Sequence, residues 1–133
     1  MYNNDPNHMA TGKGGAEFDI LEVFGVPNIW TSGIHMRNYL GEGRGAPMGE
    51  ANEDLYGWHV YGFDWQSNYL RLYRDGVLRS EIVGTDAYWY ATTMGVRLNY
   101  SMDAPWFGTK SDASTPNELT MEVDYVRVYR QKP

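Results

Sequence analysis

The sequence predicts an all-β protein, and the fold that we expect is an antiparallel β-sandwich. Apolar residues do not keep a helical spacing, whereas runs rich in Val, Ile, Tyr, Phe and Trp alternate with clusters of Gly, Pro, Asn and Asp. The 15 glycines indicate many tight turns rather than long helices. We therefore expect strands at 16–24, 30–38, 57–65, 69–74, 77–83, 88–100 and 119–130, and long loops at 40–56 and 103–118.

Two of these elements have a distinctive pattern. Asp75-Gly76 separates the runs 69–74 and 77–83, and Asp-Gly supplies the positive φ angles of a tight hairpin turn. In 88–100, apolar residues occupy one face, and the other face carries Arg97 and Asn99. A sheet with one apolar and one polar face is typical of a sheet that lines a wet groove. We expect residues 1–15 to be irregular and 16–133 to form one sandwich domain.

Composition excludes several functions. The formal net charge of -6 argues against nucleic acid as a partner, because a phosphate backbone needs a basic surface. The absence of cysteine excludes disulfides and thiolate metal sites. No apolar run approaches the ~20 residues of a membrane span, and the N-terminus does not have the pattern of a signal peptide. Aromatic residues make up 15% of the chain, a share that suits a core or a platform for sugar rings.

The strand at 16–24 carries three acids. Alternation directs Phe18 and Ile20 to the core and Glu17 and Asp19 to the opposite face, with Glu22 one residue out of phase. A single β-bulge at Ile20-Leu21 would bring Glu22 onto the face of Glu17 and Asp19. Glu17 and Glu22 would then lie roughly 13 Å apart between Cα atoms at ~3.3 Å per residue, a gap that two leaning side chains largely close.

Paired carboxylates at this spacing suit a retaining glycosidase, in which one ionised carboxylate attacks the anomeric carbon and a protonated one protonates the leaving oxygen. Asp19, which lies between them, would form a hydrogen bond with the nucleophile and would help to keep the pKa of the acid raised by charge repulsion. A solvated polar face on an edge strand and a site for a hard cation are the alternatives. The spacing alone does not distinguish these three interpretations.

Four segments together resemble glycoside hydrolase family 16, whose members have a concanavalin A-like jelly-roll sandwich. The Glu17-x-Asp19-x-x-Glu22 strand resembles its catalytic signature, and three further segments resemble its later strands in the same order: 58–65, 69–77 and 121–129. The resemblance implies that Glu17 is the nucleophile, Asp19 its assistant and Glu22 the general acid/base. The six-residue form is that of laminarinases and agarases, which implies β-1,3-glucan or a related galactan as the substrate.

Further site residues are expected in the groove. By resemblance, His35 lies on the next strand close to the acid/base. Arg97 and Asn99 could bind sugar hydroxyls, and Trp106, in a loop, could stack on a sugar ring. No cofactor is expected, although Asp124 resembles a position that helps to bind structural calcium in some family members.

Family domains have several strands before the catalytic one, so the resemblance implies that the sandwich is truncated at its N-terminus. We expect such a chain to form a homo-oligomer or a strand-exchanged dimer, because unpaired edges and uncovered apolar surface favour association. An extracellular or periplasmic location is expected, with no membrane partner. A non-catalytic carbohydrate-binding sandwich and an inactive remnant that self-assembles remain open as alternatives.

Overall fold

The computed structural model describes residues 16–24, 29–37, 43–52, 55–84, 94–100, 102–103, 110–118 and 120–130. The chain divides into two compact units, 1–99 and 100–133. All strands of the described residues lie in the first unit. Within the described ranges, no helix is long and apolar enough to cross a membrane.

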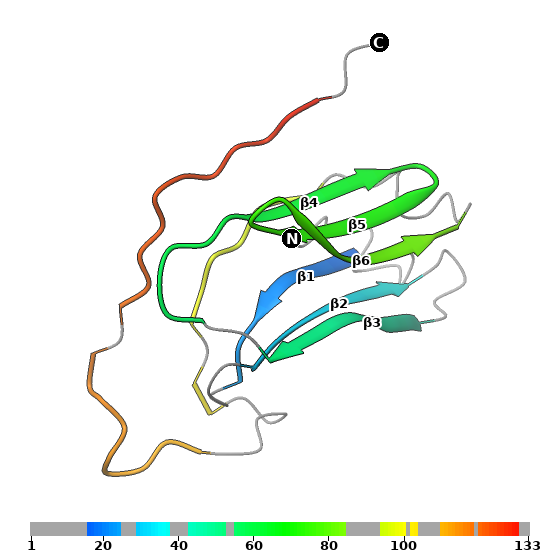
Figure 1. The fold of residues 1–133 in the computed structure, drawn as a ribbon. Helices are drawn as coiled ribbons and strands as arrows, with labels where there is room; N and C mark the ends of the chain where they lie inside the picture. The colour runs from blue at the N-terminus through cyan, green and yellow to red at the C-terminus, as the bar shows by residue number, and fades with distance from the viewer. Residues whose placement is uncertain are drawn as a thin grey trace. The chain divides into compact units, whose positions relative to one another are not determined.

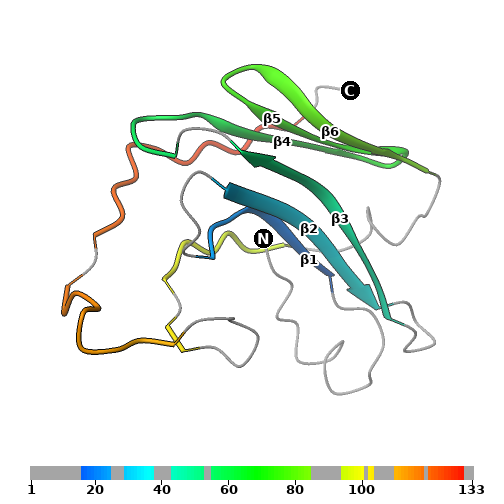
Figure 2. The ribbon, with the colours of Figure 1, turned by 60° about the horizontal axis from the view of Figure 1, so that its bottom comes forward.

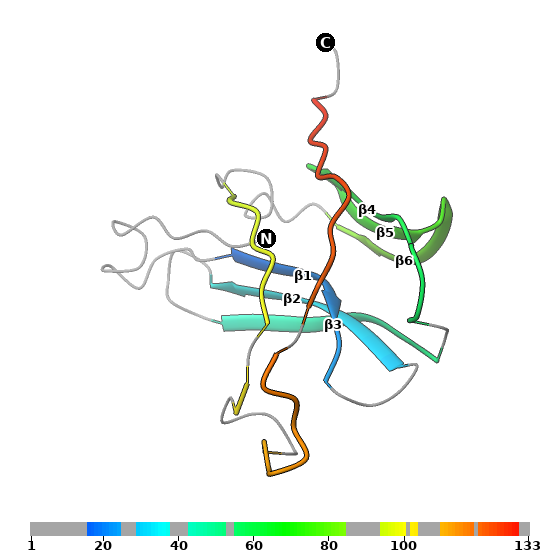
Figure 3. The ribbon, with the colours of Figure 1, turned by 90° about the vertical axis from the view of Figure 1, so that its left-hand side faces the viewer.

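The first unit contains two antiparallel three-stranded sheets (Figures 1 and 2). The first has the order β1-β2-β3, with β1 at Ala16–Glu22, β2 at Ile29–Arg37 and β3 at Gly43–Asn52. The second has the order β4-β5-β6, with β4 at Tyr61–Gln66, β5 at Tyr69–Arg74 and β6 at Val77–Val83. The expected all-β sandwich is therefore confirmed. Figure 3 shows β1, β2 and β3 side by side in one layer.

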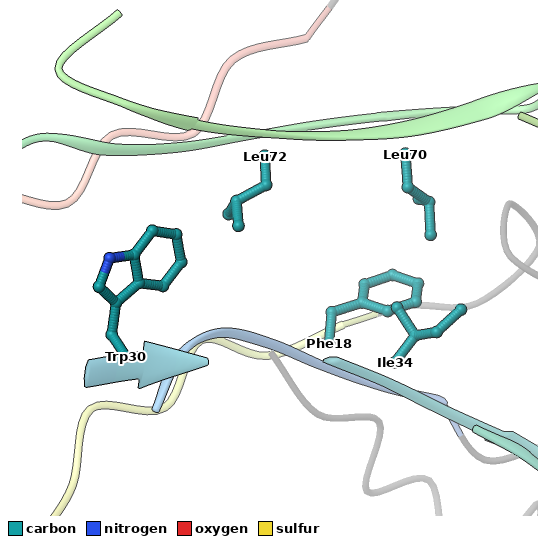
Figure 4. Close-up of a cluster of buried hydrophobic side chains, with 5 residues drawn as sticks. All are labelled: Phe18, Trp30, Ile34, Leu70 and Leu72. Carbon is teal, nitrogen blue, oxygen red and sulfur yellow. The ribbon is translucent and has the colours of Figure 1, made fainter. Parts of the chain in front are cut away.

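The core forms where the two sheets face each other (Figure 4). Phe18 is fully buried, and its ring lies 5.3 Å from that of Phe63 and 5.4 Å from that of Trp65, measured between centroids. Alternation produces this arrangement, because every second residue of a strand points to the same face. The buried apolar cluster consists of Phe18, Trp30, Ile34, Leu70 and Leu72.

The hairpin between β5 and β6 follows its sequence signal. Asp75 and Gly76 have φ angles of 51° and 77°, so both central residues have the positive values that a tight hairpin turn needs. The predicted strands 69–74 and 77–83 are confirmed at both ends.

The expected loop at 40–56 is wrong, since it contains the ten-residue strand β3. This segment has several glycines and a proline and few of the residues that favour strands. Pairing with β2 overrides the weak propensity. Pro47 lies opposite Gly33 directly beside a register shift, and β3 is an edge strand of the described sheet, where proline is tolerated.

Three other expected strands need correction. Residues 57–60 precede β4 and form no strand, and neither do residues 94–100 and 120–130. Residues 88–93 lie outside the described residues. An alternating pattern does not by itself supply a partner strand: only Gly95 of these residues has an isolated β-bridge, and residues 95–100 and 120–130 are exposed. The apolar face assigned to 88–100 is consequently exposed at Val96 and Leu98, while Met94 packs against the core.

The second unit contains loop structure stabilised by short polar contacts. The carboxylate of Asp103 accepts hydrogen bonds from the Ser111 backbone N–H at 2.7 Å and from its hydroxyl at 2.5 Å. Asp112 accepts similar bonds from Ser114. These local bonds compete with strand pairing and fit the predicted loop at 103–118 over its described part.

Candidate active site

The three acids of β1 lie along β2 in a defined register. Glu17 lies opposite His35, Asp19 opposite Gly33, and Glu22 opposite Thr31. Residues directly opposite each other in an antiparallel pair point to the same face. The alternate residues of β2, Trp30, Ser32 and Ile34, are all buried. We call Glu17, Asp19 and Glu22 the acidic row, and it lies on the face of the first sheet that points away from the core.

A β-bulge brings Glu22 into this row. Two β1 residues, Ile20 and Leu21, fit between Asp19 and Glu22, whereas only Ser32 fits between their partners on β2. Two residues opposite one is the definition of a bulge, so the prediction of a bulge at Ile20-Leu21 is confirmed. Ile20 packs against the core, and Leu21 is 41% exposed.

The row raises the pKa of Glu22 above its ordinary value. Partial burial is the largest cause because it disfavours the charged form. The negative charges of Asp19 and Glu17 act in the same direction, and the His35 imidazole opposes them. A carboxyl group that retains its proton to higher pH is suited to act as a general acid.

Asp19 also has a raised pKa. Burial is again the largest cause, followed by the charge of Glu17, while His35 lowers it. The Asp19 side chain is 17% exposed, and its Oδ2 lies 3.3 Å from Nε2 of His35, whose side chain is 62% exposed. His35 thus lies on the strand next to β1, opposite Glu17 and in contact with Asp19, and the place close to Glu22 that the resemblance implies stays a prediction. A positive charge on His35 would favour the ionised form of Asp19.

The arrangement of the row and His35 bears on the hard-cation alternative. Among the described residues, no group of three or more His, Cys, Asp or Glu side chains could hold a metal ion. Of the two alternatives to a glycosidase site, the hard-cation site therefore has no support from the side-chain arrangement. Asp124 is exposed in the second unit.

The remaining predicted binding residues lie apart from this strand pair. Arg97 and Asn99 are exposed and belong to no strand, so the alternation that assigned them to a groove face does not apply. Trp106 lies outside the described residues. Their roles in substrate binding stay predictions.

Two residues of β2 that sequence reasoning missed belong to the same face. Thr31 lies opposite Glu22, and Gly33 lies opposite Asp19 at the centre of the row. Gly33 is buried and has no side chain, so β2 places no side chain directly opposite Asp19. Only the register of β2 against β1 identifies these two positions, and no motif in the sequence signals that register.

Fold and site together describe an all-β sandwich with a row of carboxylates on the outer face of one sheet. The chain is 28% identical over 141 residues to glucan endo-1,3-beta-glucosidase A1 of Niallia circulans, an alignment that covers 92% of the chain and 20% of that protein. It thus spans about a fifth of the length of this curated relative. The similarity indicates a relationship to a glycoside hydrolase. No family model and no solved structure matches the chain.

Proposed function

We propose that the chain is the catalytic-strand region of a retaining endo-β-glycosidase of glycoside hydrolase family 16 that hydrolyses β-1,3-glucan. The bulge carries this proposal, because it sets Glu22 on the face of Glu17 and Asp19 in surroundings that raise its pKa. The similarity to a glucan endo-1,3-beta-glucosidase supports the substrate class.

The acids have separate roles in this reaction. The Glu17 carboxylate attacks the anomeric carbon while Glu22 transfers its proton to the glycosidic oxygen, so that the C–O bond breaks and a glycosyl ester forms on Glu17. Water then attacks the ester, Glu22 takes up the proton of that water, and Glu17 is released as a carboxylate. Asp19 lies between them and raises the pKa of Glu22 by its charge.

The test is reducing-sugar release from laminarin, lichenan, agarose and carrageenan. The unaltered chain should act on laminarin, and Glu17→Gln and Glu22→Gln should each abolish turnover while substrate still binds. Glu81→Gln is the matched control, since Glu81 lies on β6 of the other sheet. Azide should partly restore turnover of Glu17→Ala with inverted anomeric configuration. Unchanged turnover in either Gln variant would refute the assignment.

We also propose that the chain self-associates. Residues 120–130 are exposed in the second unit, with Val128 and Tyr129 more than 80% exposed. Of the described strands, β1, β3, β4 and β6 each have an open edge. Pairing of such a segment with an edge of a second copy would bury both. Light scattering should show a mass above 15.2 kDa, and a concentration-independent monomer would contradict the proposal.

An extracellular or periplasmic location belongs to the same proposal, because polymeric glucans are too large to enter a cell intact. Fractionation of a producing culture would check it, with activity expected outside the cytoplasm.

A further inference from the structure

Strand β6 forms an open edge of the second sheet. It pairs with β5 on one side, and among the described strands none pairs with its other side (Figure 1). Backbone N–H and C=O groups along such an edge can pair with a further strand. Apolar side chains at both ends of β6 lie in water, since Val77 is 54%, Leu78 47% and Val83 71% exposed. This edge is therefore suited to the addition of a strand.

The sequence of β6 is complementary to itself when two copies run in opposite directions. Ser80 is the central residue of the strand, Arg79 precedes it and Glu81 follows it. Two-fold antiparallel pairing centred on Ser80 therefore places Arg79 of each copy opposite Glu81 of the other. Opposite charges at directly facing strand positions attract each other. Beyond these charges, the apolar residues 77–78 of each copy face the apolar residues 82–83 of the other.

The two charges also disfavour the neighbouring registers. A shift by one residue exchanges the two faces of a strand, so a shift by two is the smallest that keeps the same faces together. In one direction, that shift would bring the two copies of Arg79 opposite each other, and in the other direction it would do the same for Glu81. Parallel pairing in register would place each charge opposite its own copy. Because like charges directly opposite each other are destabilising, Arg79 and Glu81 select the register centred on Ser80.

A β-bulge beside Ser80 further restricts which strands can pair with this edge. Leu72 of β5 lies opposite Ser80, whereas the next β5 residue, Tyr73, lies opposite Leu78, so Arg79 is the extra residue. A bulged and charged edge resists pairing with an unrelated strand. A second copy carries the same bulge, which occurs symmetrically on both sides of the two-fold axis.

Glu81 is held in place for a contact with Arg79 of the other copy. Its Oε1 accepts a hydrogen bond from Nε of Arg71 on β5 at 2.5 Å, and its side chain is 32% exposed. A carboxylate has two acceptor oxygens, so Glu81 can bind a second guanidinium without losing the first.

We propose that two copies of the chain associate through β6, with the two-fold axis at Ser80, so that their three-stranded second sheets join into one continuous sheet. This inference rests on the self-association proposed above and assigns one surface to it. The acidic row lies on the other sheet, so the inference does not depend on the glycosidase.

Ser80→Cys tests the position of the two-fold axis, because the chain has no cysteine of its own. Facing residues of an antiparallel pair have Cβ atoms about 4.5–5.5 Å apart, close to the separation that a disulfide requires. Mild oxidation should convert this variant into a covalent dimer that a reductant reverses, as seen by electrophoresis without reductant. Ser67→Cys is the matched control, since Ser67 is exposed in the turn between β4 and β5 and should not cross-link.

Charge reversal tests the register, with self-association measured by sedimentation over a range of concentrations. Arg79→Glu and Glu81→Arg each place like charges opposite each other twice in the dimer, so each should weaken association by about tenfold or more. An equimolar mixture of the two variants should associate like the unaltered chain, because every facing pair then has opposite charges again. Glu118→Arg, at an exposed position of the second unit, controls for the change in net charge. Circular dichroism verifies that each variant folds, and the cysteine variant decides alone if Glu81→Arg does not.

The outcomes separate this interface from self-association in general. Reversible cross-linking of Ser80→Cys, together with association of the mixed charge variants, would support pairing through β6. Self-association without cross-linking at this position, or charge variants that associate as tightly as the unaltered chain, would refute the interface and leave the proposed self-association in place. A monomer at every concentration would overturn both.

Discussion

Replacing Asp19 by Asn should stabilise the protein at neutral pH. The Asp19 carboxylate is largely covered and is repelled by Glu17, and the exposed His35 lies beside it as a compensating neighbour. Asn has nearly the same shape and no charge. Because an interaction between partly exposed charges is worth on the order of 0.5 kcal/mol, we expect a gain of that size after the loss of the His35 contact. For a unit of this size the gain corresponds to a rise in Tm of about 2 to 4 °C.

The effect should depend on pH in one direction. The pKa of Asp19 is raised above its ordinary value of 3.8, so the folded chain retains this proton at a pH where the unfolded chain has lost it. The stability that this proton contributes is present below the unfolded pKa and is lost as pH rises through the folded pKa. The Asn variant should therefore be more stable than the unaltered chain at pH 7 and equal to it at about pH 3.

Calorimetric melting at both pH values measures this difference. Asp64→Asn is the matched control, because Asp64 on β4 accepts hydrogen bonds from Tyr69 and Gln66 at 2.9 Å. Loss of that acceptor should lower Tm or leave it unchanged at pH 7. A lower Tm for Asp19→Asn at pH 7, or a gain of the same size at both pH values, would show that charge crowding in the acidic row is not the cause.

Three further predictions follow from the same contacts. Phe18→Ala should lower the free energy of unfolding by about 3 to 5 kcal/mol in urea titration, because it removes a fully buried ring that contacts both sheets, and a loss below about 1 kcal/mol would contradict this packing. Gly76→Val should cost about 1 to 2 kcal/mol in the same assay, since valine does not tolerate a φ of 77°. In a profile of kcat against pH, the alkaline limb should reflect the raised pKa of Glu22, and it should move to lower pH in Asp19→Asn because the negative charge of Asp19 is lost. An alkaline limb that does not move would show that Asp19 does not raise the pKa of the acid.

Strong local signals predicted part of the fold. The Asp75-Gly76 hairpin and its two strands were predictable because the turn geometry and the alternating pattern act within a few residues. β3 was not, since its residues favour loops and it forms through pairing with β2. Residues 120–130 show the reverse case. Their sequence alternates like that of a strand, but among the described residues no partner strand forms backbone hydrogen bonds with them.

The candidate site likewise has a part that one strand predicts and a part that depends on the pairing of two strands. The order of the acids and the bulge follow from spacing on a single strand, so they were predictable from β1 alone. The neighbours of the acids depend on which β2 residue lies opposite each one, and a shift of one position in the pairing would exchange the two faces of β2. Sequence therefore predicted Glu17, Asp19 and Glu22 as candidate site residues, while the positions of Thr31 and Gly33 opposite them became visible only with the register.

The bulge itself argues against an ordinary solvated edge. Without it, Glu22 would share the parity of Phe18 and point into the core, where an unpaired carboxylate costs several kcal/mol. A merely polar outer face would be obtained more simply with an acid at position 21 and regular pairing. Instead, β1 exposes Leu21 to bring Glu22 beside Asp19, where both carboxyl groups have raised pKa values. An exposed Leu21 beside three neighbouring acids is what the proposed catalytic role of these acids requires, and a merely solvated face does not require it.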